Sequence, residues 1–279
     1  NQPYFLLLDQ SQSRLYVYRN DMGTPVLEAD YFFSIGLKGS GKQKRGDQKT
    51  PVGVYHVTSY IDDDALPDLY GRGAFPINYP NNWDKRKQRT GNGIWLHGTP
   101  SNTYNRAPLS SNGCMVVSNP DFINLKPYIK PEFNTPIIVV KSINWIDKYE
   151  WASQQKQFVE TITSWLTAWE NKTHTKYIQH YSTSDFISDG RDFDQFNRYK
   201  RRVNNAKTFI QVGINNLNIY RYPEEENLIL MQFDQAYRSN NFNLDSPKEL
   251  YWKLQNDAWK IVHEGSRKIN IRKAIASNQ

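Results

Sequence analysis

The chain of 279 residues contains a single cysteine, Cys114, in the segment SSNGCMVVSNP at residues 110–120. His97 precedes it by 17 residues, in the segment GNGIWLHGTP at residues 91–100. A cysteine nucleophile needs a base that takes its proton, and donors for the oxyanion of a tetrahedral intermediate. A histidine and a glycine-containing loop are residue types that can supply both.

The loop that ends at the cysteine is the candidate oxyanion and substrate-binding site. Gly113 frees the backbone there, so the amide groups of Asn112, Gly113 and Cys114 can point into one small concavity. Ser111 adds a hydroxyl that could hold the turn. We therefore expect Ser111, Asn112 and Gly113 to bind the oxyanion or the substrate.

His97 is the candidate base. It follows the apolar run at residues 94–96 and precedes Gly98, so a strand that ends there would present the imidazole at a sheet edge or pocket. If Nδ1–H donates to a backbone carbonyl, Nε2 becomes the base that faces the thiol. Both residues also have a plain structural interpretation, because a lone cysteine is often a small buried hydrophobe. The residues alone leave both interpretations open.

The elements that must position these residues are mostly strands. The β-rich runs at residues 4–9 and 14–19, separated by QSQS, predict a hairpin. Further strands are expected within residues 26–36, 52–60 and 135–143, and residues 61–92 are expected to form a long irregular loop. After the cysteine, Ser118 or Asn119 should begin a helix, with Pro120 at its first position.

The second half of the chain begins with helical patterns, whereas the first half has mostly strand patterns. Apolar residues recur at helical spacing within residues 146–171, which predicts one long amphipathic helix. Shorter helical pieces around residues 193–207 precede several long strands, with turns expected at residues 223–227 and 239–247. Helices followed by consecutive strands indicate an α+β unit. We expect two domains, residues 1–142 and 143–279.

Charge and hydropathy exclude several classes of protein. No run of about 18 apolar residues occurs, so an integral membrane protein with helical spans is not expected. The net charge of +7 is spread evenly, with an excess of +4 in residues 1–142 and +3 in the remainder. Basic residues cluster only in short runs, at residues 42–45, 85–89 and 198–202. Such short runs are typical of solvated surfaces, so we do not expect a nucleic-acid partner.

The sequence contains no recognisable metal motif. Five histidines form no HExxH pattern, and one cysteine cannot build a zinc constellation. We expect an enzyme that needs no metal and no cofactor. Tyr79, Trp83 and Trp95 could line a cleft, although aromatic residues in a β domain are more often core residues.

Three segments carry a family resemblance: TPVGVYHV at residues 50–57, GIWLHGTP at residues 93–100, and SSNGCMVVSNPD at residues 110–121. In this order and spacing they resemble the YkuD-type L,D-transpeptidase family, over approximately residues 3–142. The resemblance implies a mostly-β sandwich in which a thiol attacks the carbonyl after meso-diaminopimelate in a peptidoglycan stem tetrapeptide. It implies Cys114 as the nucleophile, His97 as the base, and the Gly98 carbonyl as the group that orients the imidazole.

Two positions depart from the family pattern. The family's usual histidine before Gly-Cys is Asn112 here, and the arginine or asparagine two residues after the cysteine is Val116. These departures and the second half resemble the L,D-carboxypeptidases of helical and curved Gram-negative bacteria, in which an NTF2-like domain follows the catalytic one. Residues 164–186 are similar to the opening helices of that fold.

The resemblance implies a periplasmic enzyme, exported by a signal peptide absent from this chain, that trims stem tetrapeptides to tripeptides and so modulates cell shape. Its partners would be peptidoglycan stem peptides and possible cell-wall proteins that contact the second domain. An amine in place of water would resolve the same thioester, so a transpeptidase that forms 3-3 cross-links or exchanges D-amino acids is the alternative. A non-catalytic murein-binding module is the alternative of another class.

Overall fold

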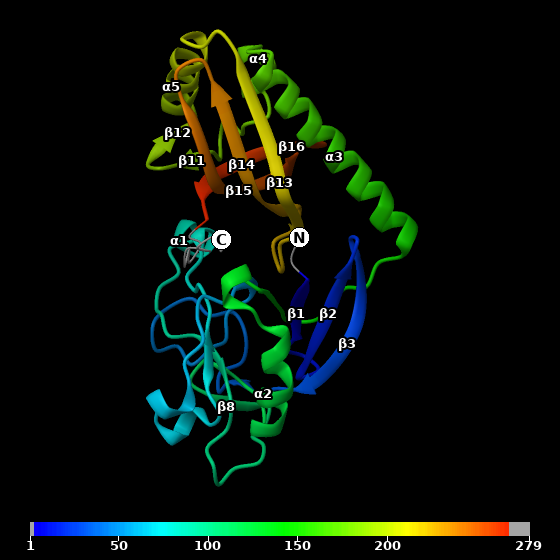
Figure 1. Cartoon of the computed structure of the whole chain (residues 1–279), viewed down its shortest axis with the longest axis vertical. Helices are drawn as coiled ribbons and strands as arrows, with labels where there is room; N and C mark the ends of the chain where they lie inside the picture. Colours follow the sequence, from blue (N-terminus) through cyan, green and yellow to red (C-terminus); the bar gives the residue numbers. More distant parts are fainter. Residues whose placement is uncertain (1–2, 268–279) are drawn as a thin grey trace, which may run out of the picture. The chain divides into compact units, whose positions relative to one another are not determined.

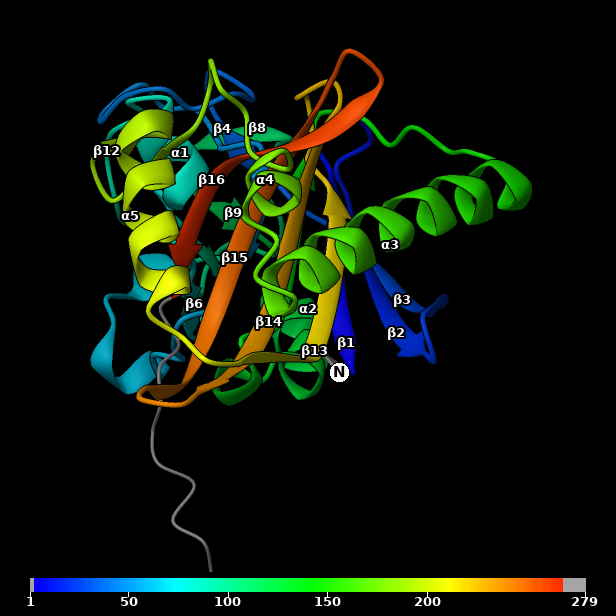
Figure 2. The ribbon, with the colours of Figure 1, turned by 90° about the horizontal axis from the view of Figure 1, so that it is seen from above.

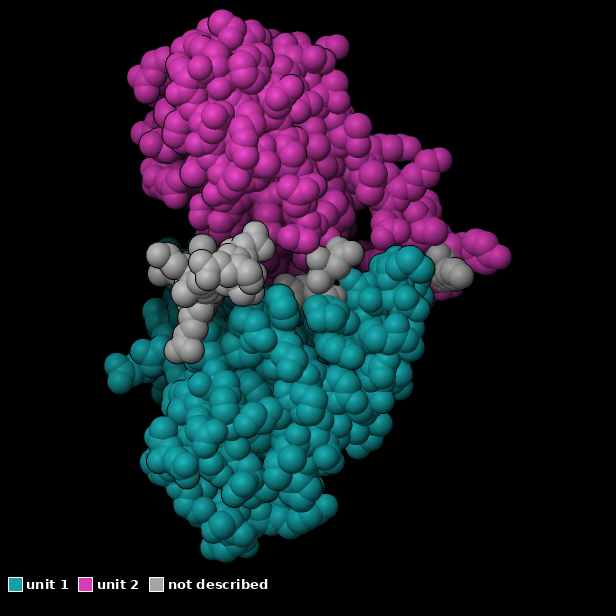
Figure 3. All heavy atoms as spheres, viewed as in Figure 1, with its two compact units in different colours: residues 1–143, 269–279 teal, residues 144–268 magenta. Residues whose placement is uncertain are grey.

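The computed structural model describes residues 3–267, which fold into two compact units (Figure 1). Residues 3–143 form the first unit and residues 144–267 form the second (Figure 3). No helix in the described range has the length and apolar character needed to cross a bilayer.

The first unit is built on a five-stranded sheet with the order β3-β2-β1-β10-β5. Its strands are β1 Tyr4–Asp9, β2 Arg14–Asp21, β3 Thr24–Phe32, β5 Gly53–His56 and β10 Pro136–Val140. β1 and β2 form the predicted antiparallel hairpin, and β10 pairs with β1 in parallel. The β-branched run of β10 is typical of such a buried central strand.

Two smaller sheets complete the first unit. One contains β6-β7-β9 and the other pairs β4 with β8. Their strands are β4 Ile35–Gly36, β6 Ala74–Pro76, β7 Trp95–His97, β8 Leu109–Ser111 and β9 Met115–Val116. The helices are η1 Asp63–Ala65, η2 Asp68–Tyr70, α1 Asn82–Arg86, α2 Asn119–Leu125, η3 Lys126–Tyr128 and η4 Pro131–Phe133. The expected irregular loop at residues 61–92 therefore contains a strand and three short helices.

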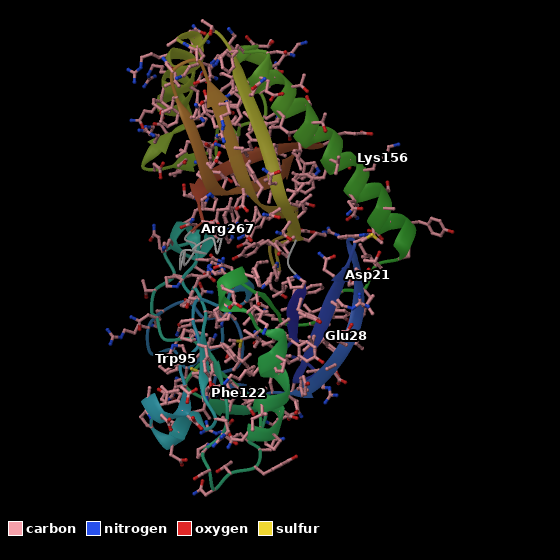
Figure 4. All side chains as sticks on the ribbon, in the orientation of Figure 1. Asp21, Glu28, Trp95, Phe122, Lys156 and Arg267 are labelled. Carbon is pink, nitrogen blue, oxygen red and sulfur yellow. The ribbon has the colours of Figure 1, made fainter. Side chains whose placement is uncertain are left out.

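One hydrophobic core joins the sheets and α2 of the first unit. Alternate residues of β1 and β10, such as Leu6 and Ile137, are completely buried in it, as are Leu96 of β7 and Met115 of β9. Phe122, labelled in Figure 4, adds its ring from α2. The core therefore fixes β7 and β9, the two strands that flank the candidate chemistry.

The N-terminus of α2 follows the predicted pattern with a shift of one position. The Ser118 hydroxyl accepts the Asp121 amide at 3.2 Å, so Ser118 is the N-cap. The helix begins at Asn119, which places Pro120 at its second position and not its first.

The second unit is a four-stranded antiparallel meander with helices on one face. Its sheet has the order β13-β14-β15-β16, and α3, α4 and α5 pack against it through one aromatic-rich core (Figure 2). The elements are α3 Lys148–Glu170, α4 His174–Ile178, β11 Ile187–Ser188, β12 Arg191–Asp192, α5 Phe193–Asn205, β13 Ile210–Arg221, β14 Leu228–Ser239, β15 Asn243–Gln255 and β16 Ala258–Ser266. The predicted long helix and the α+β class are confirmed.

The strand boundaries of the second unit differ from the expectation in two places. A further turn, not expected from the sequence, separates β15 from β16, because Asn256 and Asp257 both adopt positive φ and form a tight hairpin turn. The turn expected at residues 239–247 is shorter, since β15 already begins at Asn243 and Pro247 lies inside it. Pro247 of β15 lies opposite Asp234 of β14. On the other side of β15, the pairing with β16 begins only at Lys248, so Pro247 has no partner in β16.

Candidate active site

Cys114 and His97 are carried by neighbouring parallel strands. β7 pairs with β9, with Leu96 opposite Met115 and His97 opposite Val116, and Cys114 immediately precedes β9. Paired strands lie about 4.8 Å apart, and side chains alternate between the two faces. Because Leu96 and Met115 point into the core, the thiol and the imidazole lie on the opposite face of the sheet.

The imidazole of His97 is held as a neutral base. Its Nδ1 lies 2.7 Å from the carbonyl oxygen of Gly98; a carbonyl only accepts, so Nδ1 carries the hydrogen and Nε2 keeps its lone pair. The side chain is buried, and the ring packs edge-on against Tyr70. Burial lowers the pKa of His97 to about 4, although the bond to Gly98 opposes this shift. At neutral pH the ring is therefore able to accept a proton.

The thiol of Cys114 is also neutral in the resting protein. It is partly exposed, and it donates a hydrogen bond to the Gly93 carbonyl at 3.5 Å. Burial raises its pKa, and the Trp95 amide only partly offsets this effect. In the part of the chain that the structure describes, no hydrogen bond joins the thiol to His97. The site thus holds a neutral thiol and a neutral imidazole. A nucleophilic attack by this sulfur would require the thiol proton to move at the same time.

The turn before the cysteine is fixed by side-chain hydrogen bonds. The Ser111 hydroxyl donates to the Cys114 carbonyl at 2.6 Å and accepts the Gly113 amide at 3.0 Å. Thr50 Oγ1 donates to the Gly113 carbonyl at 3.0 Å. Gly113 has a φ of +122°, and a Cβ there would lie 2.8 Å from the Lys49 carbonyl oxygen, so only glycine fits.

These bonds correct one expectation about the oxyanion site. The Gly113 amide is already donated to Ser111, so it cannot also serve an oxyanion. The amides of Asn112 and Cys114 form no backbone hydrogen bond within residues 3–267. Two of the three expected donors are therefore left to stabilise developing negative charge.

Sequence profiles of two families match the chain. The profile of the YkuD L,D-transpeptidase catalytic domain matches residues 3–139, which include Cys114, His97 and the turn between them. The chain carries an L,D-transpeptidase domain. The profile of the Cds6 C-terminal NTF2-like domain matches residues 157–265, so an NTF2-like domain follows. Both parts of the resemblance found in the sequence are confirmed.

Solved structures share this combination of domains. Bd1075 of Bdellovibrio bacteriovorus is 29% identical, with a TM-score of 0.81 over 97% of this chain and 94% of that chain. The helical cell shape determining protein Pgp2 of Campylobacter jejuni is 25% identical, with a TM-score of 0.80 over 94% of this chain and 91% of that chain. No curated protein sequence matches the chain significantly.

The two departures from the family pattern have different consequences in the L,D-transpeptidase domain. Asn112 is exposed, and its Oδ1 accepts a hydrogen bond from Gln48 Nε2 at 3.3 Å. Val116 is buried, and its backbone exchanges two hydrogen bonds with Ser34. Asn112 can therefore meet a substrate, whereas Val116 cannot.

Two of the three aromatic residues expected at the cleft are core residues instead. The Tyr79 ring packs against Tyr55 inside the hydrophobic core, and its hydroxyl donates to the Thr90 carbonyl at 3.2 Å. Trp83 is 3% exposed in α1, so it presents no surface to a substrate. Trp95 is partly exposed and packs against Tyr70, so it is the one of the three that can contact a ligand (Figure 4).

Asn119 supports the segment that follows His97. Its Nδ2 donates to the Thr99 carbonyl at 2.8 Å, and its Oδ1 accepts the Arg72 amide at 3.0 Å. A Cβ at Gly98 would lie 2.3 Å from this Oδ1, so glycine is required there. Sequence reasoning missed this role because the bonds join residues 20 and 47 positions apart.

The potential metal ligands that gather in the first unit do not include Cys114 or His97. Within the described residues, the one group of carboxylates close enough to share an ion is Asp62, Asp63 and Asp64. Neither member of the thiol–imidazole pair belongs to it.

The NTF2-like domain contains a cavity of about 470 Å³ between α5 and strands β14, β15 and β16. Lys200 and Glu264 form an ion pair of 3.4 Å in its wall, and Glu264 accepts a further bond from the Tyr181 hydroxyl at 3.0 Å. The cavity is therefore lined partly by charged groups that already neutralise one another.

Proposed function

We propose that the chain is a cysteine-dependent peptidoglycan L,D-carboxypeptidase that cleaves the bond between meso-diaminopimelate and the terminal D-alanine. The L,D-transpeptidase domain places the chain among enzymes that act on peptidoglycan. The observation that carries the carboxypeptidase proposal is the similarity to Pgp2, a helical cell shape determining protein, across both domains. Trimming of tetrapeptides to tripeptides would modulate cell shape, and the enzyme would work in the periplasm.

The first half of the reaction forms a thioester. Cys114 Sγ attacks the diaminopimelate carbonyl while Nε2 of His97 takes the thiol proton. The oxyanion of the tetrahedral intermediate lies where the amides of Asn112 and Cys114 can donate to it. Collapse of this intermediate breaks the peptide bond, and the imidazolium gives its proton to the departing amine of D-alanine.

The second half of the reaction releases the tripeptide. His97, neutral again, takes a proton from a water molecule that attacks the thioester carbonyl, and collapse of the second intermediate returns the proton to the sulfur. If a D-amino acid or a second stem peptide supplied an amine instead, the same thioester would yield an exchanged or 3-3 cross-linked product. The acceptor therefore decides between the carboxypeptidase and the transpeptidase.

A product analysis tests this proposal. The purified protein is incubated with disaccharide tetrapeptide, with and without excess D-methionine, and the muropeptides are separated and weighed by mass spectrometry. We expect tripeptide and free D-alanine in both reactions, and no product from Cys114→Ala. Dimers with 3-3 links, or incorporation of D-methionine in place of trimming, would overturn the carboxypeptidase assignment in favour of transfer.

A further inference from the structure

We propose that Arg106 binds a carboxylate of the substrate and thereby selects the peptide that Cys114 attacks. The proposal rests on the function proposed above, and it assigns one more residue to the same site. Two carboxylates of the tetrapeptide have the required chemistry: the terminal carboxylate of D-alanine and the free side-chain carboxylate of diaminopimelate.

Hydrogen bonds hold the Arg106 backbone beside the strand that follows the nucleophile. Its carbonyl accepts the Ser34 hydroxyl at 3.3 Å. Ser34 in turn exchanges backbone bonds of 2.8 and 3.0 Å with Val116, two residues after Cys114. Ser34 therefore links the Arg106 backbone to β9, the strand that begins directly after Cys114, although Arg106 and Ser34 are 72 residues apart in the sequence.

The loop that carries Arg106 is also tied to the segment after His97. Thr99 Oγ1 donates to the Tyr104 carbonyl at 3.5 Å, and the amide of Ile35 donates to the Pro108 carbonyl at 2.8 Å. The loop thus runs from the base to the strand beside the nucleophile. The charge of Arg106 acts on His97 and on Cys114, consistent with this position. Burial has the largest effect on each pKa, and the positive charge of Arg106 lowers both pKa values.

Among the described residues, Arg106 has no counter-ion. Within residues 3–267, its guanidinium forms no ion pair and no hydrogen bond, and the side chain is only partly exposed. Lys42, the other cation whose charge reaches Cys114, is paired with Asp47 at 2.7 Å and is buried. The fold therefore neutralises one of the two charges near the thiol and leaves the other for a ligand. A guanidinium matches a carboxylate through two parallel hydrogen bonds.

An occupied Arg106 would also assist the chemistry. His97 becomes positively charged when it takes the thiol proton, and an unpaired guanidinium nearby opposes that charge. A substrate carboxylate bound to Arg106 would cancel this opposition. Binding of the correct peptide would thus make His97 a stronger base at the moment when the base is needed.

Kinetics with matched variants and substrates test the proposal. Arg106→Gln should lower kcat/KM for the tetrapeptide about 10- to 100-fold, the usual range for a lost charge-assisted hydrogen bond, and Arg106→Lys should recover part of it. Arg19→Gln is the control: Arg19 lies on β2 and pairs with Glu28 of β3, so its loss should leave kcat/KM unchanged. Since the guanidinium of Arg106 bonds to no group in residues 3–267, Arg106→Gln should melt at the same temperature as the wild type.

Amidated substrates identify the carboxylate. Two amidated tetrapeptides are compared, one that ends in D-alanine amide and one with amidated diaminopimelate. One of them should lower the kcat/KM of the wild type by the same factor as Arg106→Gln lowers kcat/KM for the natural peptide. The variant should show no further loss with that same amide. The proposal would be overturned if each amide lowered kcat/KM by the same factor in the wild type and in Arg106→Gln. It would also be overturned if Arg106→Gln left kcat/KM for the natural peptide unchanged.

A binding measurement separates this inference from the proposed function. Calorimetry measures the tetrapeptide's affinity for Cys114→Ala and for the double variant Cys114→Ala/Arg106→Gln. If the wild type fails to cleave but the double variant binds about 10-fold more weakly than Cys114→Ala, the reaction assignment fails and the role of Arg106 stands. Equal affinities, or no binding by either protein, would refute that role.

Discussion

The buried base makes the stability of the L,D-transpeptidase domain depend on pH in a way that His97→Gln should abolish. An exposed histidine has a pKa near 6.5, whereas burial lowers that of His97 to about 4. As the pH falls below 6.5, the unfolded chain takes up a proton that the folded domain refuses, so stability is lost as the pH falls from about 6.5 to about 4. At pH 4 this loss amounts to about 3 kcal/mol, because each unit of pKa difference contributes about 1.36 kcal/mol.

The comparison of wild type with His97→Gln isolates this contribution. Other groups titrate in both proteins, so the informative quantity is the difference between their free energies of unfolding at each pH. Hydrogen exchange of peptides from β7, followed by mass spectrometry, reports this quantity for the first domain alone. We expect the advantage of the wild type to shrink by about 3 kcal/mol between pH 7 and pH 4. A difference that does not change with pH, or an imidazole that titrates near 6.5 by NMR, would refute the argument for a buried neutral base.

Three further predictions follow from the same geometry. The resting site holds a neutral thiol and a neutral imidazole, so kcat/KM should stay level between about pH 5 and pH 8 and fall only as His97 is protonated. A bell-shaped pH profile in which kcat/KM falls below about pH 6.5 would contradict this. Gly98→Ala should lower the free energy of unfolding by about 1–3 kcal/mol in urea titrations, since its Cβ would meet Asn119, and Asn119→Ala in the same chain should recover part of the loss. Iodoacetamide should abolish turnover by alkylating the partly exposed Cys114, whereas EDTA should leave it intact, and loss of activity in EDTA would reveal a metal.

Features of the fold that follow from local pattern were predictable from the sequence. The alternating runs of β1 and β2 predicted their hairpin, and the apolar stripe of residues 146–171 predicted α3. The start of α2 was predicted because a serine cap before Asn-Pro-Asp is a local signal. The turn between β15 and β16 was missed because Asn256 and Asp257 are not followed by the glycine that usually marks such turns.

Features of the site that depend on distant contacts were not predictable. The sequence identified Cys114, His97 and Ser111 as candidates, since they lie in two short segments. It could not show that the Ser111 hydroxyl accepts the Gly113 amide, because the turn conformation decides that bond. Nor could it show that Tyr79 faces the core, because Tyr79 lies in an irregular segment between β6 and α1, where no periodic pattern marks the buried side. The position of Arg106 depends on its hydrogen bond to Ser34, which lies 72 residues away in the sequence and pairs with Val116 of β9.

The most direct test of the account is to weigh the protein during turnover. Wild type mixed with tetrapeptide muropeptide and quenched in acid within milliseconds to seconds should carry one tripeptidyl group, and peptide mapping should place it on Cys114 as a thioester. His97→Gln should form this adduct far more slowly, and Cys114→Ala should form none. An adduct on another residue, or tripeptide released by Cys114→Ala at the wild-type rate, would contradict the claim that this thiol and this imidazole cleave peptidoglycan.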